Sequence, residues 1–146
     1  MHFLHFYIHN IIQPYTMTAS DFNLSNLKVF LNHIYELKKG IRKMALFTTH
    51  SRNREFAVQR LETQGIDYVV QEVSGGRNVN IYFGAGECME VVRIIIDRPL
   101  HMLSPEEDFM LGAMLGYDIG VQCRRFCQRK GTEKAGYIGT AAATIP

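Results

Sequence analysis

Apolar residues recur along the chain with two different spacings, and the changes between them predict the order of the secondary structure. Spacings of three and four residues predict an amphipathic helix, whereas short apolar runs or strict alternation predict strands. The predicted order is a helix, a strand, a helix, two strands and two more helices, at residues 25–39, 44–49, 52–64, 66–73, 78–83, between Gly86 and Pro99, and 104–129.

Residues at the ends of these helices carry recognisable capping signals. Ser25 and Ser51 are predicted N-caps, and Gly40 and Gly65 follow the first two helices as terminating glycines. The strongest local signal is Ser104-Pro105-Glu106-Glu107, which combines a capping box with a proline in the first helical turn.

The elements from about Lys43 to Asp97 predict an α+β fold, with a ferredoxin-like three-stranded sheet of β-α-β-β-α order. Because crossovers between parallel strands are right-handed, the third strand should lie between the first two and antiparallel to both. We expect helices on one face of this sheet, plus extra N- and C-terminal helices. In the third strand, apolar residues alternate with Asn78, Asn80 and Tyr82, which predicts one buried and one polar face. The first strand is left with an open edge that the extra helices or a second subunit would cover.

The chain of 146 residues suits one domain, which we place at residues 17–130. Residues 1–16 are apolar and rich in histidine, and they lack the features of a signal peptide. We interpret them as a disordered leader or a start-site artefact, with translation beginning near Met17. A metal site formed by their histidines on a helix is the alternative. Residues 131–146 are predicted to be a disordered tail.

Composition narrows the classes of function. A formal net charge of +2 does not indicate a dedicated nucleic-acid binder, and no apolar run is long enough to span a membrane. The three cysteines, Cys88, Cys123 and Cys127, form neither a disulfide framework nor a zinc pattern. Reduced thiols in a cytoplasmic protein are the simplest interpretation, and we expect no metal or cofactor.

Three glycines lie four residues apart in the predicted last helix, at Gly112, Gly116 and Gly120. Each destabilises a helix by about 1 kcal/mol relative to alanine, which suggests that something approaches the backbone closely. Close internal packing, a dimer interface and a flat ligand are the three interpretations. Cys123 and Cys127 extend this stripe, either as small core residues or as a redox or metal pair.

A basic cluster lies at the junction of the first helix and first strand, at Lys38, Lys39, Arg42 and Lys43. We expect Arg52 and Arg54 close by. One interpretation is a solvated helix end, and the sharper one is a docking patch for an acidic partner protein.

Titratable side chains offer one weak candidate for a ligand site. His33, His50 and Asp118 are candidates for a base or a ligand, but none stands at the spacing of a known catalytic motif. The segment from Gly84 to Glu87 lies between a strand and a helix, where a phosphate can bind. A tight turn is the simpler interpretation, because the segment lacks the P-loop ending. No catalytic residue is therefore predicted.

Three stretches together resemble a small bacterial family classified only as a domain of unknown function: residues 28–40, residues 83–84 with 87–93, and residues 103–112 with 115–118. The resemblance covers residues 28–128. It implies three strands, several helices and a homodimer, and an association with flavodoxin genes. It supplies no active site to carry over.

These observations favour a non-enzymatic binding or regulatory module that forms a homodimer and acts with a flavodoxin or another acidic protein. The alternatives are an enzyme or cofactor carrier that uses the His33, His50 and Asp118 region or the cysteines, and a small-ligand sensor.

Overall fold

The computed structural model describes the backbone of residues 19–137 and the side chains of residues 25–131. The predictions for residues 1–16, for Met17 and for residues 138–146 lie outside the described residues. The helices and strands are α2 (Ala19–Lys38), β1 (Met44–His50), α3 (Arg54–Thr63), β2 (Asp67–Glu72), β3 (Asn78–Gly84), α4 (Gly86–Ile95), α5 (Pro105–Met114) and α6 (Ile119–Tyr137). Short 3₁₀ helices occupy Ser51–Asn53 and Leu100–Met102.

The sheet has the predicted strand order. β3 lies between β1 and β2 and is antiparallel to both, so β1 and β2 run parallel. Met44, Gly84 and Asp67 align at one end of the sheet, and His50 pairs with Asn78 at the other. No fourth strand occurs in the described part of the chain. The α+β class is thereby confirmed.

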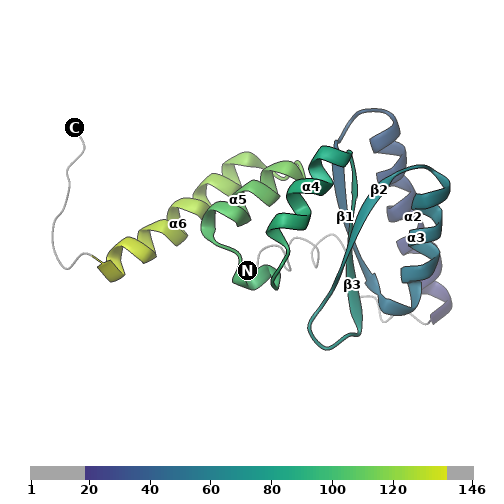
Figure 1. Ribbon diagram of the computed structural model, residues 1–146, viewed down its shortest axis with the longest axis horizontal. Coiled ribbons are helices and arrows are strands. Elements are labelled where there is room, and N and C mark those ends of the chain that lie inside the picture. Colours follow the sequence, from purple (N-terminus) through teal and green to yellow (C-terminus); the bar gives the residue numbers. More distant parts are fainter. Residues whose placement is uncertain (1–18, 138–146) are drawn as a thin grey trace.

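Helices cover both faces of the sheet, so the prediction of helices on one face is wrong. Figure 1 shows α2 and α3 on one side, and α4 followed by α5 and α6 on the other. The core under α2 and α3 consists of Phe30, Ile34, Ala45, Phe47, Ala57, Leu61, Val79, Ile81 and Phe83. The core under α4 and α5 consists of Met44, Tyr82, Met89, Val92, Ile95, Leu103, Leu111 and Leu115.

The central strand is buried on both faces, which the alternation in β3 did not predict. Tyr82 is fully buried and Asn80 is 7% exposed. Their polar atoms are satisfied inside the protein, since the Tyr82 hydroxyl and the Asn80 amide both donate to Gln71 Oε1, at 3.1 and 3.3 Å. Polar side chains with such partners can occupy a buried face.

The capping predictions are confirmed at three helices and wrong at two positions. Gly40 and Gly65 have positive φ angles of 73° and 67° and end α2 and α3. Ser104 and Glu107 form the predicted capping box of α5. α2 already runs from Ala19, so Ser25 is not its cap. After β1, His50 takes the capping role instead of Ser51, because its Nδ1 accepts a hydrogen bond from the Arg52 amide.

The predicted last helix is two helices, so its glycines do not form one stripe. α5 ends at Met114, and Gly116 turns the chain with a φ of 75°. Asp118 then opens α6, its Oδ1 accepting a hydrogen bond from the Val121 amide at 2.9 Å. α6 continues to Tyr137, beyond the expected end near Arg129. Gly112 lies in α5 and Gly120 in the first turn of α6, so the shared face does not exist.

None of the helices in the described range has the length and apolar content needed to cross a bilayer.

Candidate functional site

Three exposed lysines gather where α2 meets β1, at the top of Figure 1. Lys38 ends α2, Lys39 follows it in the turn, and Lys43 precedes β1. The Gly40 turn between them is closed by the Ile41 amide, which donates to the Glu36 carbonyl at 2.9 Å. The Lys43 carbonyl accepts from the Ala85 amide at 2.9 Å, which ties this junction to the start of α4. These backbone hydrogen bonds hold the segment that carries the lysines in place.

Within the described part of the chain, these lysines differ from most other cations in lacking an acidic partner. Lys38 donates to the neutral side chain of Gln64, and Lys39 Nζ lies 5.6 Å from the Tyr35 ring centre. Among the described side chains, no carboxylate lies within ion-pair distance of Lys38, Lys39 or Lys43. Their charges are available to a partner molecule.

Arg42 belongs to the predicted cluster but its charge is neutralised. The turn after α2 brings it back to Glu36, with which it forms an ion pair. Both side chains of this pair are half-buried. Arg42 therefore stabilises the turn, and the open positive charge at this junction comes from the lysines.

The sequence interpretation expected Arg52 and Arg54 near this junction, and that expectation is wrong. They follow His50, at the opposite end of β1. The seven residues of β1 separate the two ends by about 20 Å. Arg54 also has an acidic partner, since its guanidinium lies 3.6 Å from the Glu72 carboxylate.

Two exposed apolar side chains lie among the lysines. Tyr35 is 55% exposed and Ile41 is 68% exposed. We call the surface formed by Tyr35, Lys38, Lys39, Ile41 and Lys43 the basic corner. Sequence reasoning missed Tyr35 and Ile41, although Tyr35 lies off the apolar stripe of its helix and Ile41 lies in a turn. An aromatic and an aliphatic residue within a charged rim are typical of protein interfaces.

The three residues of the predicted ligand site do not come together. His33 lies on α2 and packs near Phe83 of β3, with the two ring centres 6.5 Å apart. His50 lies opposite Asn78, about 16 Å along β3 from Phe83. Asp118 lies between α5 and α6 and caps α6. His50 and Asp118 therefore have capping roles, and the three side chains form no joint site.

His33 has an unusual environment of its own. Its Nδ1 is buried and has no hydrogen-bond partner among the described residues. Burial lowers the pKa of His33 below its usual 6.5, and the charge of Arg42 lowers it further, while Glu36 acts in the opposite direction. The neutral imidazole is therefore the form that the folded protein accommodates.

We expect the free energy of unfolding to fall as the pH is lowered through 6.5, because the unfolded chain takes up a proton that folded His33 resists. This contribution is fully present above the unfolded pKa and is lost below it. Urea unfolding at pH 7.5 and 5.5 measures the difference. The His33→Gln variant should show a smaller pH dependence than wild type, whereas the variant of exposed His101, His101→Gln, should not. Equal pH dependence in all three proteins would contradict the assignment to His33.

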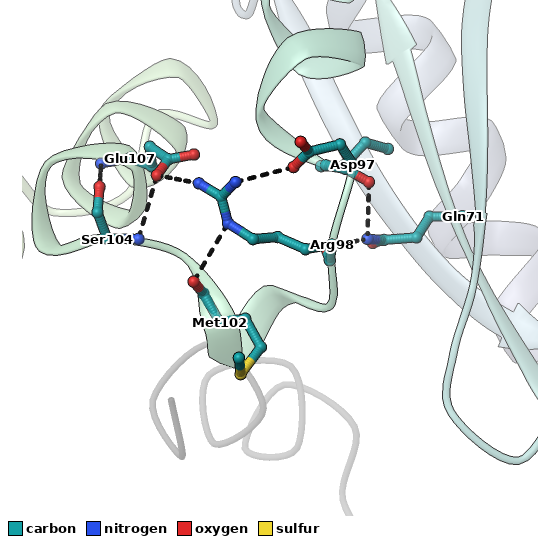
Figure 2. A network of polar contacts seen from close by, with 7 residues as sticks. Gln71, Asp97, Arg98, Met102, Ser104 and Glu107 are labelled. Atoms are coloured by element: carbon teal, nitrogen blue, oxygen red, sulfur yellow. Dashed lines mark hydrogen bonds and ion pairs between the residues drawn. The ribbon is translucent and has the colours of Figure 1, made fainter.

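A polar network crosses the face of the sheet beneath α4 and α5. Thr48 donates to Asn80 at 2.7 Å, and Gln71 accepts from Asn80 and Tyr82. Burial raises the pKa of Tyr82 far above its usual value, so its hydroxyl remains a donor. Gln71 in turn donates to the Arg98 backbone carbonyl at 3.1 Å (Figure 2).

The network continues from Arg98 to α5. Figure 2 shows the Arg98 guanidinium between Asp97, the Met102 carbonyl and Glu107. The hydrogen bond from Ser104, aided by Arg98, holds the pKa of Glu107 below its usual value. These contacts fix the connection between α4 and α5.

The turn from Gly84 to Glu87 is a packing feature. A Cβ at Gly84 would lie 2.6 Å from Met44 Cα and closer still to the Lys43 carbonyl. Cys88, in the first turn of α4, is half-buried, and burial raises the pKa of its thiol. Glu87 adds to this rise and Lys43 opposes it. The tight-turn interpretation accounts for the glycine.

Comparison with known families gives one match. The model of a family described as "Protein of unknown function (DUF2023)" matches residues 28–129. This range runs from α2 into α6 and contains the whole sheet and the basic corner. No curated protein matches the chain.

Proposed function

The chain belongs to the DUF2023 family of proteins of unknown function, and from this premise we propose that it is a non-enzymatic binding module that docks an acidic protein on its basic corner. A flavodoxin is the specific partner that we propose, because the sequence resemblance implies that association and flavodoxins are acidic. The single observation that carries the proposal is the group of three exposed lysines without acidic partners, set around Tyr35 and Ile41.

The chemistry of the basic corner suits a charged partner surface better than a small ligand. Lysines on the rim of an interface accelerate association and select partners of opposite charge. Tyr35 supplies a large, rigid contact that an apolar patch of the partner can cover. An enzyme using His33, His50 and Asp118 has less support, since those residues lie apart.

A homodimer forms part of the proposal. Its support is the family resemblance and the outer edge of β1, which no strand of the described chain pairs. The glycines no longer support it, because they do not share a helix face. The solution mass from light scattering tests this element separately from partner binding.

We expect the triple variant Lys38→Glu, Lys39→Glu, Lys43→Glu to bind flavodoxin at least about tenfold more weakly than wild type. Calorimetry or biolayer interferometry with a purified flavodoxin from the same organism measures this effect. Binding by wild type should weaken as salt rises from about 0.1 M to about 1 M, where the Debye length falls from about 10 Å to about 3 Å.

The matched control changes three exposed arginines outside the basic corner: Arg60→Glu, Arg77→Glu, Arg124→Glu. Both triple variants lower the formal net charge by six units from +2 to −4. Weakening confined to the basic-corner variant supports the proposal. Equal weakening of both would mean that net charge alone acts, and salt-insensitive binding or none would refute the flavodoxin assignment.

A further inference from the structure

α6 presents two free cysteines to solvent. Cys123 and Cys127 are both exposed. The opposite side of the helix holds α6 against α5: Gln122 is buried and Arg125 pairs with Asp108. Phe126 also packs on α5, with its ring centre 5.6 Å from that of Phe109. The thiols therefore lie on the side of α6 that faces away from α5, and Figure 1 shows α6 running along α5 and away from the sheet.

Exposure removes the interpretation of these cysteines as core residues. Free cysteine is among the most buried residue types, because it packs as a small apolar side chain. Cys88 follows that rule on α4, where it is half-buried against the core. Cys123 and Cys127 make no such contribution, so packing does not explain two thiols on one exposed face.

The helix sets the distance between the two side chains. Residues four apart have Cβ atoms about 5–6 Å apart. A disulfide requires about 3.5–4.5 Å, so Cys123 and Cys127 cannot be joined directly while α6 stays helical. Two metal–sulfur bonds of about 2.3 Å each reach sulfurs up to about 4.6 Å apart. The spacing fits a bridging metal ion and disfavours a disulfide.

The number of ligands narrows the choice of metal. Among the described side chains, no group of three or more His, Cys, Asp or Glu is placed to hold a metal ion. A tetrahedral ion such as zinc would lack protein ligands here. Soft thiolate ligands select Cu(I), a soft monovalent ion that two thiolates can hold. The resulting complex has one negative charge.

We propose that Cys123 and Cys127 chelate one Cu(I) ion per chain. Both thiols lose a proton on binding, two sulfur–copper bonds form, and no oxidation state changes. This site is separate from the basic corner, which lies at the α2–β1 junction, so neither proposal depends on the other.

An anaerobic titration of the reduced full chain with Cu(I), in competition with the chromogenic chelator bicinchoninate, tests the site. Wild type should withdraw one Cu(I) per chain from the chelator. Cys123→Ser and Cys127→Ser should each bind more weakly by over a hundredfold, exceeding the 10–100-fold loss typical of an outer-shell change. Cys88→Ser should bind like wild type.

Three outcomes would overturn the proposal: no copper withdrawn by wild type, single serine variants that bind like wild type, or half an ion per chain. The last would mean that two chains share one ion. Far-UV circular dichroism gives an independent readout, because an ion that fits the helical spacing leaves the helix signal unchanged. A fall in helix signal on adding Cu(I) would contradict the geometry.

Discussion

Replacing Gly84 with alanine should destabilise the protein by more than about 4 kcal/mol, an effect large enough to leave much of the chain unfolded. Gly84 has a φ of 145°, a conformation that side chains rarely adopt. An added Cβ would also lie 2.6 Å from Met44 Cα and closer to the Lys43 carbonyl. Both neighbours are backbone, and Met44 is completely buried in register with Gly84. No rotamer change can relieve the contact, so β1 and β3 must separate.

Gly65→Ala is the matched control for this prediction. Gly65 also has a positive φ, 67°, but nothing lies within 4 Å of an added Cβ. Its substitution should therefore show only the conformational cost, about 1–2 kcal/mol. Urea unfolding followed by circular dichroism compares the two variants with wild type. Similar unfolding midpoints for Gly84→Ala and Gly65→Ala would show that the close approach to β1 is not a constraint.

The elements that the sequence predicted well are those whose signals are local. The capping box at Ser104 and the terminating glycines Gly40 and Gly65 act within one helical turn, so neighbouring residues suffice to identify them. The strand order follows from the sequence of elements and the handedness of crossovers. These features required no knowledge of tertiary contacts.

The errors arise where distant residues decide the outcome. Asn80 and Tyr82 look like solvent-facing positions of β3, but Gln71 on β2 satisfies both, which allows α4 and α5 to cover them. The sequence pattern predicted one helix that runs through Gly116, yet Gly116 turns the chain so that α6 folds back on α5. In both cases a partner remote in sequence outweighs the local pattern.

The sequence was enough to predict that basic residues cluster at the candidate site. It was not enough to predict which of them lack an acidic partner. Lys38, Lys39 and Lys43 stand close together in sequence, so their clustering was evident. The pairing of Arg42 with Glu36 depends on the geometry of the turn after α2. Arg54 lies far from the basic corner because β1 runs away from it. Sequence alone gives the number of charges, whereas the fold determines which remain open.

Asp108→Ala should destabilise the protein by about 3–5 kcal/mol, because it leaves a half-buried cation without its partner. Asp108 is 6% exposed and receives two hydrogen bonds from Arg125, at 2.7 and 3.2 Å. Arg129 lies 3.6 Å from the same carboxylate and also donates to the Leu103 carbonyl at 2.9 Å. One carboxylate thus joins two turns of α6 to the start of α5.

A double-mutant cycle separates the ion pair from the packing around it. Asp108→Leu combined with Arg125→Met removes both charges and should recover much of the stability that either single change loses, since a buried pair can often be replaced by apolar side chains. Glu106→Ala, at an exposed position paired with Lys130 on the same two helices, should change the unfolding midpoint far less. If the single and double variants were equally unstable, shape and not charge would hold α6 on α5. If the cycle gives the expected coupling, α6 depends on Asp108 for its position, and the exposed face that carries Cys123 and Cys127 depends on it too.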